Sequence, residues 1–303
     1  PIKAATLKMA YSDERVIHFG LVPRAHRSIF VINELPDLQA RIQVSLFNIL
    51  QEGDIQIRGF KLRLPLDIQF LFTANPEDYT NRGSIITPLK DRIESQILTH
   101  YPKTIDIARS ITKQEAKLTA EQREKIVVPD LLEVLLEQVA FEARDSEFVD
   151  SKSGVSARLT ISGYENLVST AERRLLINRE NKTIARLTDL WGVVPAITGK
   201  VELVYEGEQE GPYLVAINLM GKAFKKLFLD HFPDPDKLRK GRDRDPYGVI
   251  RAWFSGGHAV NLLNDMSDKE FRAALESVAG LRKFVEATLP QLSGDEVYTY
   301  MEL

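Results

Sequence analysis

Polar side chains follow two apolar segments of the chain at positions that suit chemistry. The run SIFVIN (residues 28–33) is apolar and rich in β-branched residues, and it leads into Asn33 and Glu34. A second apolar run, residues 66–75, ends at Asn75. Such runs are typical of buried parallel strands, and ligands bind at the carboxyl ends of those strands. The pattern predicts that Glu34 and Asn75 lie beside each other at one edge of a sheet.

The residue types indicate which chemistry this edge would support. A carboxylate such as Glu34 can accept a proton from an attacking water, and a neutral amide such as Asn75 can orient that water. The Asn33 amide can accept a hydrogen bond from a metal-bound water, although it brings no negative charge. Two structural alternatives remain open. Glu34 can stabilise the N-terminus of a following helix, and an Asn-Pro pair is a common turn.

An arginine follows in the segment TPLKDRIES, where Arg92 lies on a predicted short helix after the second strand. A guanidinium group is always charged and its shape suits phosphate oxygens, so an exposed arginine here can reach the phosphate site of a neighbouring subunit. The alternative interpretation is a surface salt bridge between Arg92 and Asp91 or Glu94.

Composition limits the class of protein. The 303 residues are 44% hydrophobic and 27% charged, with a net charge of −3 and no cysteine. These values indicate a globular protein without disulfides or thiolate metal sites, which suits a reducing cytoplasm. Nucleic acid is not an expected partner, and the apolar runs are too short for a membrane span. Because the chain begins at Pro1 without an initiator methionine, we expect a piece of a longer protein.

The elements that position these residues alternate in type along the first hundred residues. We expect a helix from Pro36 to Gly53, a β-hairpin at 54–65 around Gly59, and a third parallel strand at 95–99. Farther along, we expect helices at 113–124, 129–145, 157–180, 182–190 and 214–231, a strand at 200–205, an acidic loop at 206–210, a charged linker at 233–246 and short helices at 247–303.

Taken in order, these segments resemble AAA+ ATPases, most closely the branch of the magnesium chelatase AAA subunit and the MoxR-type ATPases. IFVINE resembles the Walker B strand, and GDIQIRGFKLRLP resembles the hairpin before sensor 1. FTANPED resembles sensor 1 with Asn75 as the sensing residue, and ITPLKDRI resembles the arginine-finger segment with Arg92 as the finger. GVSARLTISGYENLVSTAERR resembles the sensor 2 helix with Arg158 as the sensor.

The resemblance implies an α/β fold in three parts. Residues 1–104 would be a partial AAA+ parallel-sheet core, residues 105–192 a helical lid carrying sensor 2, and residues 193–303 a mostly helical C-terminal extension.

The resemblance also implies a cytoplasmic, magnesium-chelatase-like motor that hydrolyses ATP to remodel a partner protein or to insert a metal. Glu34, Asn75 and Arg92 would be catalytic, and Asn33 and Arg158 would contact the nucleotide. Asn33 and Glu34 would hold Mg²⁺ through water and the nucleotide. The protein would assemble as a ring, expected to be a hexamer, in which one subunit supplies Glu34 and Asn75 and its neighbour supplies Arg92.

Two departures from the family pattern leave other functions open. Asn33 replaces the usual Walker B aspartate, and no GxxxxGK[ST] phosphate-binding loop occurs in the chain. We expect that loop to precede these residues, so this chain alone is expected to be inactive. One alternative is a non-hydrolysing regulatory or scaffolding relative. Another is an enhancer-binding transcription activator, although the chain contains no GAFTGA loop.

Overall fold

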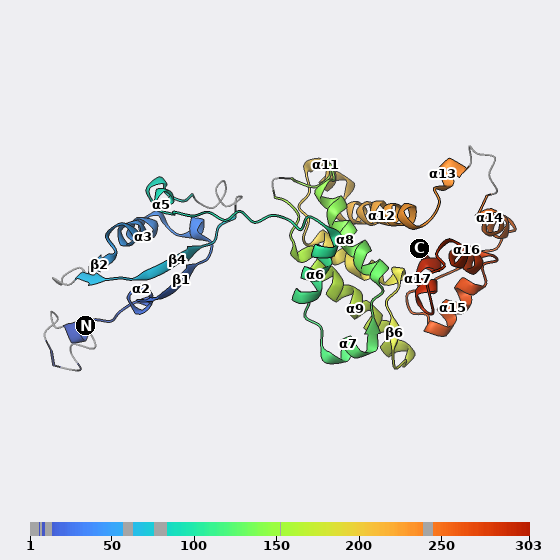
Figure 1. Cartoon of the computed structure of the whole chain (residues 1–303), viewed down its shortest axis with the longest axis horizontal. Coiled ribbons are helices and arrows are strands. Elements are labelled where there is room, and N and C mark those ends of the chain that lie inside the picture. The colour runs from blue at the N-terminus through green and yellow to red at the C-terminus, as the bar shows by residue number, and fades with distance from the viewer. Residues whose placement is uncertain are drawn as a thin grey trace. The chain divides into compact units, whose positions relative to one another are not determined.

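The computed structural model describes residues 6, 8–9, 14–56, 63–75, 84–151, 153–238 and 245–303. The chain forms two compact units, residues 1–99 and residues 100–303, and each is described by itself. The predicted class, an α/β segment followed by a mostly helical region, is confirmed (Figure 1).

The N-terminal unit is organised around two parallel strands, as the apolar runs predicted. Strand β1 (Ser28–Ile32) pairs in register with β4 (Ile68–Phe72), so that Ile32 lies opposite Phe72. The other elements are η1 (Glu14–Val16), α2 (Leu21–Arg24), η2 (Leu35–Asp37), α3 (Ala40–Glu52), β2 (Asp54–Gln56), β3 (Arg63–Pro65) and α5 (Thr87–Asp91).

The expected hairpin after β1 is present in its two strands, but the expected helix begins later than predicted: Pro36 and Asp37 belong to η2, Leu38 is extended, and α3 begins at Ala40. Helix α3 ends at Gly53, whose φ of 63° is the left-handed conformation that glycine adopts readily. Strands β2 and β3 pair antiparallel, with Asp54 opposite Pro65. The hairpin tip around Gly59 lies outside the described residues. The end of β1, which leads into Asn33 and Glu34, is therefore followed by a helix and a hairpin.

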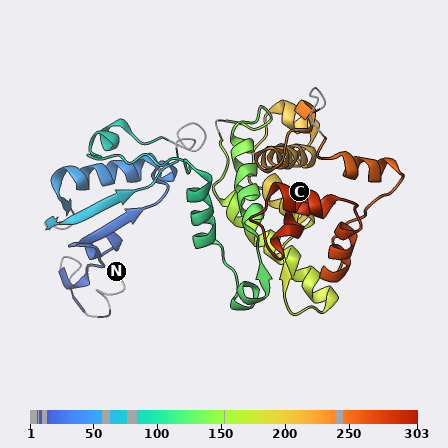
Figure 2. The same ribbon diagram turned by 45° about the vertical axis from the view of Figure 1, so that its right-hand side comes forward.

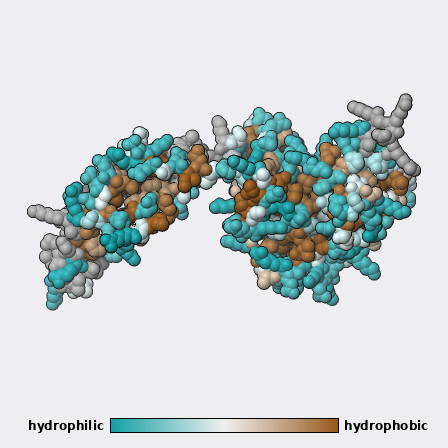
Figure 3. All heavy atoms as spheres, in the orientation of Figure 1, coloured by the Kyte–Doolittle hydropathy of each residue, from teal (hydrophilic) through white to brown (hydrophobic). Residues whose placement is uncertain are grey.

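One face of the strand pair is covered and the other is open. Helix α3 runs along one side of the strands (Figure 2), and Leu35, Leu46 and Leu89 form the centre of a small core there. Ile29 and Val31, which alternate with the inward residues of β1, are 64% and 54% exposed. Figure 3 shows apolar residues at the surface of this unit.

The strand predicted at 95–99 is not formed. Residues 95–99 belong to no strand, and Ile97 and Leu98 are 89% and 77% exposed. A parallel strand exists only when a neighbouring edge supplies its hydrogen-bond partners. In the structure, residues 95–99 pair with no described strand, so the apolar pattern alone was insufficient.

The C-terminal unit is helical around a large apolar core. Its elements are α6 (Ile105–Glu115), α7 (Ala120–Lys125), β5 (Ile126–Val127), α8 (Asp130–Arg144), α9 (Arg158–Asn178), β6 (Thr183–Ile184), η3 (Leu187–Val193), α10 (Val194–Thr198), α11 (Tyr205–Glu210), α12 (Pro212–His231), α13 (Pro235–Leu238), α14 (Gly248–Ser255), α15 (Asp268–Glu276), α16 (Leu281–Thr288) and α17 (Glu296–Glu302). Helices α8, α9 and α12 all bury side chains in the same core.

Four expectations in this unit were wrong. The helix expected at 113–124 is interrupted, because Thr119 begins α7 with a capping box. Residues 182–190 form β6 and the start of η3, because β6 pairs in parallel with β5. The strand expected at 200–205 is reduced to two isolated bridges, at Val201 and Leu203. The acidic loop at 206–210 is instead part of α11.

The remaining helix predictions hold. Helices α8, α9 and α12 match the segments expected at 129–145, 157–180 and 214–231, and α14 to α17 are the expected short helices. Part of the charged linker, residues 239–244, lies outside the described residues, and α13 occupies its first part. The division into lid and extension at residue 192 stays a prediction.

Two charged networks attach the last helices of this unit to its core. Arg174, which is 1% exposed, pairs with Asp189 at 2.8 Å and with Asp268 at 3.1 Å. Glu302 accepts hydrogen bonds from the backbone N–H groups of Leu187 at 2.7 Å and Thr188 at 2.9 Å. Because Asp268 and Glu302 belong to α15 and α17, these contacts fix the C-terminal helices on η3 and α9.

Candidate functional site

The carboxyl ends of β1 and β4 meet in a hydrogen-bonded junction. The Thr73 N–H donates to the Ile32 carbonyl at 3.0 Å, and the Leu35 N–H donates to the Thr73 carbonyl at 2.9 Å. The Thr73 hydroxyl donates a hydrogen bond to Asn33 Oδ1 at 3.3 Å. The same hydroxyl oxygen accepts a hydrogen bond from the Glu34 N–H at 3.1 Å. Thr73 therefore fixes the backbone on both sides of the Asn33-Glu34 pair.

Glu34 has a backbone conformation that few non-glycine residues adopt. Its φ and ψ are 53° and 55°, in the left-handed region. This conformation costs roughly 1 kcal/mol for a residue with a β-carbon, and such residues are found preferentially at functional sites. It ends β1 and turns the chain into η2, where Leu35 is fully buried. Glu34 itself remains exposed at the strand end.

The structure brings Asn33, Glu34 and Thr73 together, and it leaves Asn75 at the margin of this group. Asn75 is exposed, two residues beyond Thr73, and no hydrogen bond joins it to the rest of the described chain. The predicted parallel pairing that supports its position is confirmed, whereas its proposed role in orienting a water stays a prediction. Sequence reasoning missed Thr73. The available signal was its position: Thr73 comes directly after Phe72, the partner of Ile32 in the strand register, and Asn33 comes directly after Ile32.

Arg92 immediately follows α5. Its guanidinium lies 3.9 Å from Asp91 and 5.9 Å from the centre of the Phe47 ring, and its side chain is 46% exposed. The Asp91 contact is long and exposed, so it holds the arginine weakly. The arginine is thus accessible to a second molecule, while the surface salt bridge of the alternative interpretation is also present.

Gln43 positions the segment that precedes Arg92, and sequence reasoning did not single it out. This side chain is 1% exposed on α3. Its Nε2 donates to the carbonyls of Leu38 at 2.9 Å and Ser84 at 3.1 Å, and its Oε1 accepts the Ile86 N–H at 2.9 Å. A polar residue on the inward face of a predicted amphipathic helix was the available signal, because buried amides need partners.

A cavity of about 280 Å³ lies beside the junction. It is lined by Phe72, Thr73 and Ala74 on the β4 side and by Lys90 and residues 95–99 on the other. Lys90 supplies a cation near the strand ends. Glu34, Asn75 and Arg92, the residues predicted to be catalytic, are not among those that line this cavity.

The donor set fits a hydrated Mg²⁺ better than a directly bound one. Asn33 and Glu34 supply oxygen ligands, which Mg²⁺ prefers, but only one of them is charged. No group of three or more His, Asp or Glu side chains in the described segments is arranged to hold a metal ion.

Arg158, the predicted sensor 2 residue, is the first residue of α9 in the C-terminal unit. Its side chain is exposed, and its N–H donates to the Ser156 hydroxyl at 3.2 Å. The start of α9 at this residue agrees with the expected helix at 157–180. Its contact with a nucleotide stays a prediction.

Sequence comparison relates the N-terminal unit to a known family. Residues 5–97, about a third of the chain, match the sigma-54 interaction domain, which is an AAA+ domain. The match supports the predicted AAA+ relationship for this segment. It does not extend to the magnesium chelatase or MoxR-type branch, which stays a prediction. No curated protein shows a significant match to the chain.

Two solved structures show partial similarity. A proposed ATPase from Cytophaga hutchinsonii is 17% identical over 64% of this chain and 65% of its own, with a TM-score of 0.26. NtrX from Brucella abortus, solved with ADP, is 15% identical over 86% of this chain and 51% of its own, with a TM-score of 0.38. The chain thus spans less than two thirds of either protein, and such TM-scores do not define its fold.

Among the described helices, none combines the length and the hydrophobicity that a membrane crossing requires.

Proposed function

Taking the AAA+ match of residues 5–97 as the premise, we propose that this chain is part of an ATPase motor that remodels a partner protein. The observation that supports the proposal most directly is the junction of β1 and β4, where Glu34 is held in a left-handed conformation next to Thr73. A carboxylate whose backbone is fixed at the carboxyl end of a parallel strand is placed to act on a ligand bound there.

Each residue at the junction has a proposed role in hydrolysis. Glu34 would accept a proton from the attacking water, and Asn75 would orient that water. Asn33, whose amide oxygen faces Thr73, would hold a water of a hydrated Mg²⁺. When bound, Mg²⁺ would neutralise phosphate charge, as it does in other nucleotide hydrolases. Arg92 would donate to the phosphates of a neighbouring subunit, because its side chain is half exposed and only weakly paired.

The first experiment changes the carboxylate alone in the natural full-length protein, because this chain contains no GxxxxGK[ST] loop. Glu34→Gln keeps the side-chain shape and removes the base, so turnover should fall roughly 10²- to 10⁴-fold while ATP still binds. Glu52→Gln, at the exposed end of α3, is the matched control and should retain activity. Normal turnover in Glu34→Gln would remove this residue from the mechanism.

A mixing experiment tests whether Arg92 acts on a neighbouring subunit in a closed ring. Arg92→Ala and Glu34→Gln should each be inactive, and mixed rings should regain part of the activity at interfaces that pair an intact Glu34 with an intact Arg92. Arg41→Ala, on α3, is the control for a changed surface charge. If mixed rings assemble without regaining activity, Arg92 does not act on the neighbouring subunit, and the surface salt bridge is the better interpretation.

The family match favours one class of client as a second candidate. A domain named for sigma-54 interaction suggests that the motor acts on sigma-54 in transcription activation. This sequence contains no GAFTGA segment, but in a longer protein part of that region can precede Pro1, so the client has to be tested directly. ATP-dependent binding of purified sigma-54 by the full-length protein would support the transcription role. ATPase activity without such binding would favour a different client, such as a metal-insertion partner.

A further inference from the structure

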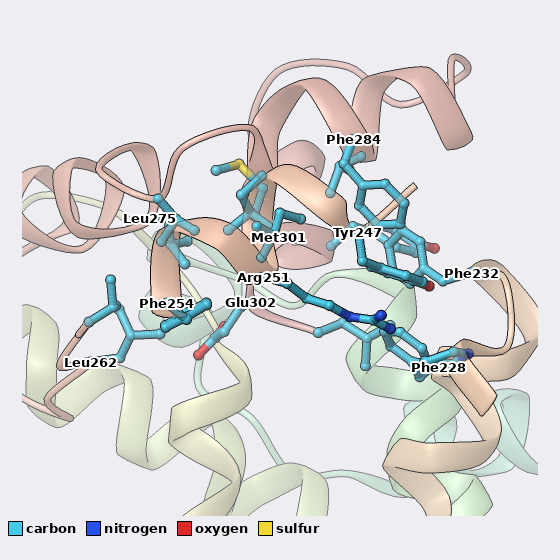
Figure 4. A pocket seen from close by; sticks show the side chains of 18 residues that line it. Phe228, Phe232, Tyr247, Arg251, Phe254, Leu262, Leu275, Phe284, Met301 and Glu302 are labelled. Carbon is cyan, nitrogen blue, oxygen red and sulfur yellow. The ribbon is translucent and has the colours of Figure 1, made fainter. Parts of the chain in front are cut away.

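A chamber of about 630 Å³ lies at the C-terminal end of α12, and none of its lining residues is among those assigned to ATP chemistry. Its walls come from α12, α14, α15, α16 and α17, all within the C-terminal unit (Figure 4). A volume in the range of 300–1,000 Å³ is typical of sites for small organic ligands. The chamber is therefore large enough for one small molecule.

Aromatic rings form one continuous wall of the chamber. The ring centres of Tyr247 and Phe284 are 4.7 Å apart, and those of Phe284 and Phe232 are 5.3 Å apart. The Phe232 and Phe228 ring centres are 5.2 Å apart. The Tyr247 hydroxyl donates to the Pro233 carbonyl at 2.6 Å, so the polar atom of this ring is already paired. This wall consequently presents apolar ring surface to a ligand.

Aliphatic side chains line much of the remaining surface. Leu275, Val278 and Val285 are at most 5% exposed, and Ile250 and Val260 complete this side. The lining is thus apolar over most of its area, and burying a hydrocarbon against it would be favourable in proportion to the area removed from water.

The polar groups of the lining differ in availability. Both carboxylate oxygens of Glu302 accept backbone N–H groups, those of Leu187 and Thr188. Arg251 pairs through Nη1 with Asp245 at 2.9 Å and lies 5.7 Å from the centre of the Tyr247 ring. A guanidinium has five N–H donors, so the Asp245 contact leaves donors for a further acceptor.

Figure 4 shows the Arg251 side chain extending across the chamber between the aromatic wall and Glu302. Among the described lining residues it is the one that carries a full positive charge. A planar guanidinium binds a carboxylate through two parallel hydrogen bonds. An apolar chamber with one arginine therefore matches a ligand with a hydrocarbon body and a single carboxylate.

We propose that this chamber binds an apolar monocarboxylate, with its hydrocarbon chain against the aromatic wall and its carboxylate on Arg251. A cationic ligand would be repelled by the arginine. A ligand with several charges would lose hydration on the apolar walls without gaining enough partners. The proposal is independent of the ATPase assignment, because no residue of the chamber takes part in it.

The first test measures chain-length dependence by calorimetry on the 303-residue chain. Octanoate, decanoate and dodecanoate should bind with dissociation constants that fall about threefold to fourfold for each added methylene. Dodecanol lacks the charge and should bind at least about tenfold more weakly than dodecanoate. Equal binding of dodecanoate and dodecanol would overturn the role of Arg251, and the absence of binding would overturn the proposal.

Two matched pairs of variants locate the site. Arg251→Gln should weaken dodecanoate binding at least about tenfold, whereas Arg173→Gln, on the exposed side of α9, should leave it unchanged. Val260→Trp should fill the chamber and abolish binding, whereas Val249→Trp, a 61%-exposed position of α14 outside the lining, should not. Circular dichroism checks that all four fold, and unchanged affinity in Val260→Trp would place the ligand elsewhere.

Vesicles of phosphatidylglycerol separate a free carboxylate from a lipid surface. Co-sedimentation with the vesicles should be negligible, since the donor group lies within a chamber of the C-terminal unit. Sedimentation that persists in Val260→Trp would show surface adsorption and would overturn the pocket assignment.

Discussion

The N-terminal and C-terminal units support their functional residues in opposite ways. The N-terminal unit holds Glu34 and Thr73 just after two parallel strands and Arg92 just after α5, and its core cluster, among the described residues, centres on three buried leucines. The C-terminal unit has a continuous core of aliphatic side chains and a fully buried ion pair, Arg174 with Asp189. The candidate catalytic groups therefore lie on the unit with the smaller described core, where we expect small changes in packing to alter their geometry.

Removing the buried acid of the C-terminal unit should have the largest effect. Asp189 is fully buried and holds both Arg174 and the Arg186 N–H, the latter at 2.8 Å. Asp189→Ala leaves a buried guanidinium without its main partner, so the unfolding free energy of this unit should fall by about 3–5 kcal/mol. Urea unfolding followed by circular dichroism measures the loss. Glu121→Gln, which affects an exposed pair with Lys125, should cause no measurable change.

Truncating a core leucine should distinguish the two units from each other. Leu89 is fully buried in the small core of the N-terminal unit, so Leu89→Ala should cost about 2–5 kcal/mol and unfold that unit alone. Limited proteolysis should then leave a resistant fragment beginning near His100. Leu219→Ala makes the same change in the C-terminal unit and should leave the protease sensitivity of residues 14–99 unchanged. Simultaneous loss of both units in Leu89→Ala would show that they unfold cooperatively.

Changing pH should affect the C-terminal unit through Glu302. Burial raises the pKa of this carboxyl to about 7, from 4.5 when exposed, against the opposing effect of its backbone hydrogen bonds. Between these pKa values the folded state retains a proton that the unfolded state releases. The Glu302 contribution to stability is therefore full below pH 4.5 and decreases by about 1–3 kcal/mol as pH rises to 7.

Unfolding measured from pH 4.5 to 8 in Glu302→Gln tests this assignment. The difference in unfolding free energy between the wild type and this variant should change with pH across that window and become constant above it. Glu147→Gln, at an exposed position, is the control for removing a surface carboxyl group. A pH-independent difference for Glu302→Gln would mean that Glu302 titrates near its ordinary pKa.

The smallest stability effect is expected at Arg92. Its contact with Asp91 is long and its side chain is nearly half exposed, so Arg92→Ala should change the unfolding free energy by less than about 0.5 kcal/mol. Thermal unfolding measures this change in unfolding free energy, with Arg41→Ala as the control. A loss above about 1 kcal/mol would show that the Phe47 contact is structural, and it would weaken the case for Arg92 as a residue that acts on phosphate.

Much of the N-terminal fold was predictable because its signals are local. Gly53 ends α3 as predicted, although the helix begins at Ala40 and not at Pro36, and the apolar runs at 28–33 and 66–75 predicted the parallel pair. The strand expected at 95–99 failed for a nonlocal reason. Its residues have the right pattern, but strand formation also requires a neighbouring edge, which periodicity does not reveal.

The candidate site was predicted only in part. The position of Glu34 at a strand end followed from the sequence, whereas its left-handed backbone and the hydroxyl of Thr73 depend on strand register. In the C-terminal unit, residues 206–210 were interpreted as a loop because they are acidic and contain glycine. They form α11, where Gly207 lies so close to the Phe148 carbonyl that a β-carbon would clash at 2.5 Å.

The hydrogen bond between Thr73 and Asn33 joins residues 40 positions apart, and this separation has a consequence for folding kinetics. The chain between them must be restricted before the junction contributes any favourable contact, whereas the first turns of the helices form from near neighbours. The junction should therefore form late during folding. In native-state hydrogen exchange, the amide of Leu35, which is bonded to the Thr73 carbonyl, should exchange sooner than amides in the middle of α8.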